Sequence, residues 1–96
     1  MSEFLLGFCN VFPRGFALAR YNFENDDLVW LDLPTTFARE VVSAEGMCFD
    51  RNTCYAVLTT EAANAYLVVL DDHLKYKNKF PLYKVRDPHS IIAFDG

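Results

Sequence analysis

The sequence has little of what would point to several common classes of protein. Three cysteines occur, an odd number with no C-x-x-C pair, so neither a disulfide framework nor a zinc knuckle is indicated. Four glycines form no phosphate-binding loop. No apolar run approaches the roughly 20 residues that span a bilayer, and the amino end carries Glu3 where a signal peptide has basic residues. We therefore expect no membrane association and a cytoplasmic location.

An excess of basic residues is also missing. Lysine and arginine total 9 against 13 aspartates and glutamates, which gives a net charge of −4. Such a surface repels phosphate groups, so nucleic acid is not an expected partner.

Apolar and aromatic residues are abundant instead. They make up 52% and 16% of the 96 residues, with nine phenylalanines. A chain of this length forms one domain at most and buries roughly 60–65% of its unfolded surface. The apolar content excludes a disordered chain and predicts a dense core.

The apolar residues come in short runs with polar residues between them, which is typical of an antiparallel all-β meander. Val, Ile, Phe and Tyr are frequent in the runs, and Pro, Gly, Asn and Asp lie between them. The predicted strands cover residues 4–9, 16–23, 28–33, 44–50, 54–60, 66–70, 75–84 and 89–94, with a connector at 35–40.

Residues 61–74, EAANAYLVVLDDHL, allow an alternative. Ala, Leu and Glu favour helix, and Thr60 is a suitable N-cap. A helix here would make the protein a small α+β domain. Against it, YLVVL is a continuous apolar block of strand length rather than a stripe of helical period.

Several runs are apolar on both faces of the predicted strand, as LVWL, YLVVL and SIIAF show. One-sided sheets alternate, so these runs predict sheets stacked face to face. LKYKNKF differs, because strand alternation places Lys75, Lys77 and Lys79 on one face and Tyr76 and Phe80 on the other. Lysines followed by Pro81 predict an edge strand.

The sequence also repeats faintly. GMCFD (46–50) matches IIAFD (91–95) at an offset of 45, and ALARYN (17–22) matches LVVLDD (67–72) at an offset of 50. A repeat of 40–50 residues with four strands has the spacing of a propeller blade.

The cadence GMCFDRNTCYAVLTT…YLVVLDDHLKYKNKF, followed by DPHSIIAFDG, resembles β-propeller proteins of the NHL and YVTN-like kind. The resemblance implies antiparallel four-stranded blades: residues 4–33 form a partial blade, 44–85 a complete blade, and 89–96 the first strand of the next blade. Propellers have about four to eight blades, so either the chain is a fragment or several copies close a ring.

Candidate site residues follow from the blade interpretation. Inner strands line the central channel, so His89, with Asp87 before it, could face the channel, and Glu45 could project into the same region. The local alternative is that Asp87 caps a turn and His89 makes a hydrogen bond nearby. Neither reading supplies a complete set of metal ligands or catalytic residues, so no cofactor or metal is expected.

Cys48 and Cys54 flank a predicted hairpin centred on Arg51. They would face each other across its strands, either as a strained disulfide or as two buried thiols.

Two functions remain open at this stage. The first is a propeller-type scaffold that binds a protein or small-molecule ligand without catalysis, and that self-associates through exposed strand edges. The second is the amino-terminal part of a propeller enzyme, a lyase or hydrolase, with His89 facing the channel.

Overall fold

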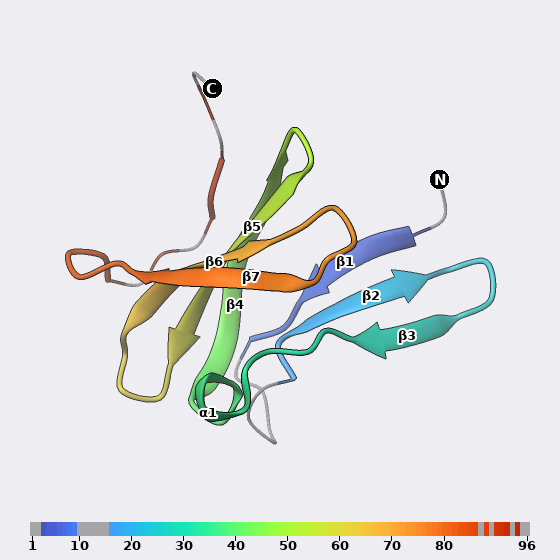
Figure 1. Ribbon diagram of the computed structural model, residues 1–96. Coiled ribbons are helices and arrows are strands. Elements are labelled where there is room, and N and C mark those ends of the chain that lie inside the picture. Colours follow the sequence, from blue (N-terminus) through green and yellow to red (C-terminus); the bar gives the residue numbers. More distant parts are fainter. Residues whose placement is uncertain (1–2, 10–15, 87, 89, 93, 95–96) are drawn as a thin grey trace.

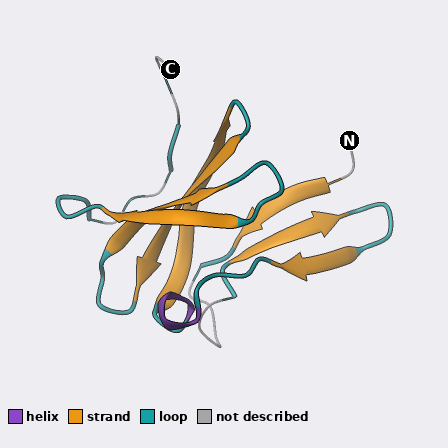
Figure 2. Cartoon of the chain, viewed as in Figure 1, coloured by secondary structure: helices purple, strands orange, loops and turns teal. Residues whose placement is uncertain are grey.

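The described residues form two antiparallel sheets joined through one turn of helix (Figures 1 and 2). The computed structural model describes residues 3–9, 16–86, 88, 90–92 and 94. The three-stranded sheet has the order β1-β2-β3 and the four-stranded sheet the order β4-β5-β6-β7. The elements are β1 (Glu3–Gly7), β2 (Leu18–Asn22), β3 (Asp27–Trp30), α1 (Thr35–Ala38), β4 (Val41–Asp50), β5 (Thr53–Thr60), β6 (Ala65–Leu70) and β7 (Tyr76–Pro81).

The prediction of an all-β chain is confirmed, and the helix considered over residues 61–74 is wrong. Ala65–Leu70 is strand β6, paired with β5 on one side and β7 on the other. The reason lies in the pattern of burial, since Val68 and Leu70 lie in the core while Leu67 and Val69 occupy the opposite face. Alternation of this kind suits a strand between two neighbours and gives a helix no single apolar stripe.

Sharp turns at the polar interruptions produce the meander. One residue with positive φ lies in each of the turns that join β2 to β3, β4 to β5, β5 to β6 and β6 to β7: Asp26, Arg51, Ala63 and Leu74, at 57°, 59°, 65° and 63°. The turn before β7 is fixed by Asp71, whose Oδ1 accepts hydrogen bonds from the backbone N–H of His73 at 2.8 Å and of Lys75 at 2.9 Å. These local bonds close the turn without help from the core.

The two sheets pack face to face, and the core lies between them. A Cβ atom at Gly7 of β1 would come within 3.1 Å of both the Ala44 Cβ and the Met47 Cε of β4, so the strands approach closely there. The Ala44 N–H donates a 2.9 Å hydrogen bond to the Phe8 carbonyl. The core consists of Ala17, Leu18, Phe37, Val41, Ala44, Cys54, Ala56, Leu58, Val68 and Leu70.

The sheets are closest at β1 and β4 and diverge toward β3 and β7. In the part of the chain that the structure covers, neither sheet closes on itself. The helix α1, with Phe37 buried, fills the space between the sheets at one end.

Ser90 and Ile91 lie over Gly46 of β4, on the side of the four-stranded sheet away from the three-stranded sheet. A Cβ atom at Gly46 would lie 2.7 Å from Ser90 Cα and 3.0 Å from Ile91 N. Ser90, Ile91, Ile92 and Phe94 belong to no strand, and the rest of the strand predicted at 89–94 lies outside the described residues. No helix in the described ranges is long and apolar enough to cross a bilayer.

Candidate binding surfaces

The residues predicted to face a channel are only partly covered by the structure. Asp87 and His89 lie outside the described residues, so their predicted role stays a prediction. Glu45 lies on β4 at an irregularity in the pairing with β5, between Ala44 and Gly46. Its Oε2 accepts a 3.3 Å hydrogen bond from the Thr59 hydroxyl. The residue is half-buried, and this contact gives its carboxylate a local structural role.

Glu45 is thus the one predicted site residue that lies within the described part of the chain. Among the residues described, no group of three or more His, Cys, Asp or Glu side chains is placed to hold a metal ion. No buried side-chain nitrogen or oxygen of that part of the chain lacks a hydrogen-bond partner. The candidate binding surfaces in the described residues are sheet faces and grooves rather than a cluster of polar side chains.

The cysteines do not face each other, which corrects the sequence prediction. Cys48 is paired with Tyr55, and Cys54 is paired with Phe49. Directly opposed residues share a face, so the two thiols lie on opposite faces of the sheet. Cys54 is buried in the core, and burial, with a smaller contribution from Cys48, raises the pKa of the Cys54 thiol to about 11.

The outer face of the three-stranded sheet is rich in aromatic residues. The register places Phe4, Tyr21 and Leu28 in one row across the sheet, on the face opposite to Gly7. Leu6 and Trp30 belong to the next row. The outer aromatic face consists of Phe4, Leu6, Phe16, Tyr21, Phe23, Leu28 and Trp30. Phe8 contacts Trp30 and also packs against the core.

The rings on the outer aromatic face contact one another and remain open to solvent. Phe4 and Phe23 stack with centroids 5.6 Å apart, and Trp30 contacts Phe8 at 5.1 Å and Phe16 at 5.4 Å. Phe23 is 54% exposed and Trp30 is 38% exposed. Soluble monomers seldom leave so many contiguous aromatic rings uncovered, and such patches are typical of interaction surfaces.

Acidic side chains border this face at the end of the β2–β3 turn. The Tyr21 hydroxyl donates a 2.6 Å hydrogen bond to Asp26 Oδ1. This hydrogen bond raises the pKa of Tyr21 above its ordinary value, because the phenolate would lose it and face the carboxylate. Glu24 lies exposed in the same turn. The register places Glu3 and Asp27 in one row with Asn22 on the inner face of the sheet.

The outer face of the four-stranded sheet is also apolar. Its residues are those opposite to the core-facing set: Gly46, Cys48, Tyr55, Val57, Leu67, Val69 and Phe80. The segment at Ser90 and Ile91 covers Gly46. Toward the edge strand β7 the cover ends, and Phe80 is 49% exposed.

A groove opens where the inner faces of the two sheets diverge. It has a volume of about 630 Å³ and is lined by Arg20, Val29, Trp30, Leu31, Asp32, Leu33, Pro34, His73, Leu74, Lys75 and Tyr76. This volume lies within the usual range for small-molecule sites. Its polar groups carry both signs of charge, and Arg20 Nε lies 3.4 Å from Glu3 Oε1.

Lys79 lies beside this groove, which corrects its predicted position on the face away from Tyr76. A pairing irregularity between Val69 and Leu70 puts Tyr76 and Lys79 on the same face. The Lys79 Nζ lies 5.2 Å from the ring centroids of both Phe37 and Tyr66. The prediction that β7 is an edge strand is confirmed. Its bulge explains the change of face, since one extra residue inverts all later side chains.

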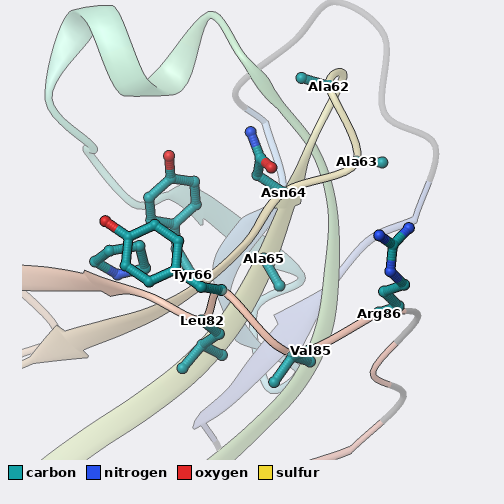
Figure 3. Close-up of a pocket in the computed structure, with 10 residues that line it drawn as sticks. Ala62, Ala63, Asn64, Ala65, Tyr66, Leu82, Val85 and Arg86 are labelled. Carbon is teal, nitrogen blue, oxygen red and sulfur yellow. The ribbon is translucent and has the colours of Figure 1, made fainter.

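A smaller pocket lies between the β5–β6 turn and the segment after β7 (Figure 3). Its volume is about 220 Å³, and Ala62, Ala63, Asn64, Tyr66, Leu82, Val85 and Arg86 are among the residues that line it. The Leu82 N–H donates a 2.9 Å hydrogen bond to the Ala65 carbonyl beneath it. The pocket is below the usual size of a ligand site.

Comparison of the chain with protein-family models, with curated proteins and with solved structures gave no match. The assignment of surfaces therefore depends on the geometry above. The sequence analysis did not single out the outer aromatic face. The signal that could have located it was the row of aromatic residues at alternate positions Phe4, Phe8, Tyr21 and Phe23.

Proposed function

We propose that this protein is a β-propeller-type scaffold that binds a protein or small-molecule ligand through its sheet faces and carries no catalytic chemistry of its own. The uncovered outer aromatic face is the observation that carries the proposal. Burying it would stabilise a complex by roughly 25 cal/mol for each Å² of apolar surface removed from water, before the costs of association.

Three features support the propeller part of the proposal. The four-stranded sheet is an antiparallel meander in sequence order, as a blade is. A second sheet stacks against it and is nearest at β1 and β4, as sheets arranged around an axis are nearest at their inner strands. Apolar residues cover both faces of the four-stranded sheet, which suits a position between two neighbours.

Self-association through exposed strand edges belongs to the same proposal. The strands β1, β3, β4 and β7 are the edges of the two sheets. Unpaired edge N–H and C=O groups accept further strands unless something blocks them. Lys77 and Pro81 block β7, so β1, β3 and β4 are the edges left for pairing.

Dye binding and solution scattering test the proposal together. At low concentration we expect a hydrophobic dye to bind the uncovered faces and to be displaced as the concentration rises. Small-angle scattering should then report a flat particle of several copies. A compact monomer at every concentration that binds no dye would contradict the scaffold function.

A further inference from the structure

An ammonium group is already held between two aromatic rings on the inner side of the four-stranded sheet. The Lys79 Nζ lies 5.2 Å from the ring centroid of Phe37 on α1 and 5.2 Å from that of Tyr66 on β6. The two rings meet nearly edge to face, at 75° and with their centroids 5.2 Å apart. A cation within about 6 Å of a ring centroid is attracted by the negative face of the ring. The two rings therefore form an aromatic site for a positive charge.

A cleft of about 360 Å³ opens at these rings. It is lined by Pro34, Thr36, Phe37, Glu40, Tyr66, Tyr76 and Lys79. Tyr76 adds a third aromatic residue to the site, and Glu40 adds an acidic one. The volume lies within the usual range for small-molecule sites. We call Phe37, Tyr66, Tyr76 and Glu40 the ammonium cage, because aromatic side chains of this kind are what proteins use to recognise quaternary ammonium ligands.

The position of Lys79 allows its side chain to leave the cage. The residue is half-buried on the edge strand β7, where its backbone is paired with Val68. Rotation of the side chain into solvent leaves this pairing intact. A lysine ammonium is compact and strongly hydrated, whereas a methylated ammonium is weakly hydrated and loses less on contact with the rings. Exchange of the two therefore returns the better hydrated cation to water.

We propose that the ammonium cage binds the quaternary ammonium group of a small organic cation, and that Lys79 occupies the cage until such a ligand replaces it. Two cations in one cage would repel each other, so the exchange is one for one. This inference goes beyond the proposed scaffold function. The cage lies on the inner side of the four-stranded sheet, away from the outer aromatic face on which that function depends.

Proton NMR of two matched ligands tests whether the site requires a positive charge. The methyl signals of choline should move upfield when the protein is added, because protons above a ring face are shielded by the ring current. The alcohol 3,3-dimethylbutanol has the shape of choline without its charge, and it should bind about fivefold or more weakly. Equal binding of the two ligands would overturn the ammonium site.

Removal of Lys79 tests its role as the internal occupant. Lys79→Ala should tighten the binding of choline about fivefold or more, because the ligand no longer has a competitor. Lys77→Ala is the matched control, since Lys77 lies exposed on the same strand and does not line the cleft. It removes the same charge and should change the binding of choline by less than about twofold. Equal effects of the two substitutions, or weaker binding by Lys79→Ala, would overturn the occupancy by Lys79.

Two further substitutions test the walls of the cage. Tyr66→Leu removes one ring but keeps apolar bulk, and Glu40→Gln removes the charge but keeps the size of the side chain. Each should weaken the binding of choline about threefold or more. Circular dichroism confirms folding, and Glu40→Gln, an exposed position, decides alone if Tyr66→Leu unfolds. Unchanged binding by the folded variants would place the ligand elsewhere and overturn the cage.

A peptide that contains trimethyllysine distinguishes the source of the ammonium group. We expect choline to bind more tightly than the peptide, because the cleft has the size of a small molecule. Tighter binding of the peptide would overturn the assignment to a small organic cation. A chain that self-associates and binds a hydrophobic dye but no choline would overturn the ammonium cage and leave the scaffold function in place.

Discussion

At the scale of single residues, burial controls the chemistry of the thiols. Cys9 is exposed, Cys48 is half-buried and Cys54 is fully buried. The pKa of Cys54 is raised to about 11 from an ordinary value of 9.0. The thiolate is the reactive form, so at pH 8 on the order of one Cys54 in a thousand is poised to react.

We therefore expect a thiol reagent at pH 8 to modify Cys9 first and Cys54 last. Mass spectrometry of the labelled peptides over time gives the order. The Cys9→Ser variant should lose the fast phase and the Cys54→Ala variant the slow phase. Labelling of Cys54 as fast as that of Cys9 would contradict the burial of this thiol.

The same shift predicts how stability depends on pH. The folded pKa of Cys54 lies above the unfolded value, so its contribution is fully present below about pH 9 and is lost as the pH rises toward 11. Urea unfolding at pH 8 and pH 10.5 should show a loss of stability that is smaller in Cys54→Ala. An equal loss in both chains would assign the effect to other groups.

At a second residue, Gly46, the segment at Ser90 leaves no room for a side chain larger than that of glycine. A Cβ atom there would lie 2.7 Å from Ser90 Cα, closer than real Cβ atoms come to backbone. We expect Gly46→Ala to lower the free energy of unfolding by about 1–3 kcal/mol. In a chain that ends at Arg86 the same change should cost less than about 0.5 kcal/mol. An equal cost in both chains, measured by urea unfolding, would show that Ser90 is not the obstacle.

At the scale of elements, the sequence was sufficient to predict strands but not their register. The hairpin between β4 and β5 turns on two residues, Arg51 and Asn52, with Asp50 paired to Thr53. A turn centred on Arg51 alone would have opposed Cys48 to Cys54. The half-residue difference reverses the face of one thiol, because side chains alternate with a period of two. Composition does not specify such an offset, whereas turn geometry does.

The position of Lys79 was missed for a related reason. Strict alternation from Lys75 would place it with solvent-facing lysines, but the irregularity opposite Val69 and Leu70 turns it toward Phe37 and Tyr66. The favourable contact of the Lys79 ammonium with two aromatic rings offsets the loss of its exposure to solvent. This contact depends on the packing of α1 against β6, where Phe37 meets Tyr66. Tertiary packing of this kind is not encoded in the local pattern of β7.

Two leucines on strands test which face of each sheet packs into the core. Leu58 of β5 is 0% exposed, and Leu28 of β3 is 41% exposed on the outer aromatic face. We expect Leu58→Ala to lower the free energy of unfolding by about 2–5 kcal/mol, because it leaves a cavity between the sheets. Leu28→Ala should cost less than about 1 kcal/mol. Urea denaturation of both variants at one low protein concentration gives the two losses of stability. Equal losses would contradict the assignment of Leu58 to the core and of Leu28 to the outer aromatic face.

At the scale of the whole molecule, the apolar content exceeds what one chain encloses. The core between the sheets takes the small and branched side chains, whereas most of the phenylalanines lie outside it. The sequence shows this excess as runs that are apolar on both faces, which predict stacking on both sides of a sheet. It does not show which neighbour covers each outer face, because complementarity of shape and charge arises only after folding.

The fluorescence of the single tryptophan reports whether the outer aromatic face is covered by a neighbour. Trp30 lies on the outer aromatic face and is 38% exposed, in contact with Phe8 and Phe16. We expect its emission to shift to shorter wavelength, and its quenching by acrylamide to decrease, as the protein concentration rises, because a second copy removes water from the indole. If light scattering reports association while the Trp30 signal stays constant, the copies meet elsewhere, and the strand edges β1, β3 and β4 become the interface to examine.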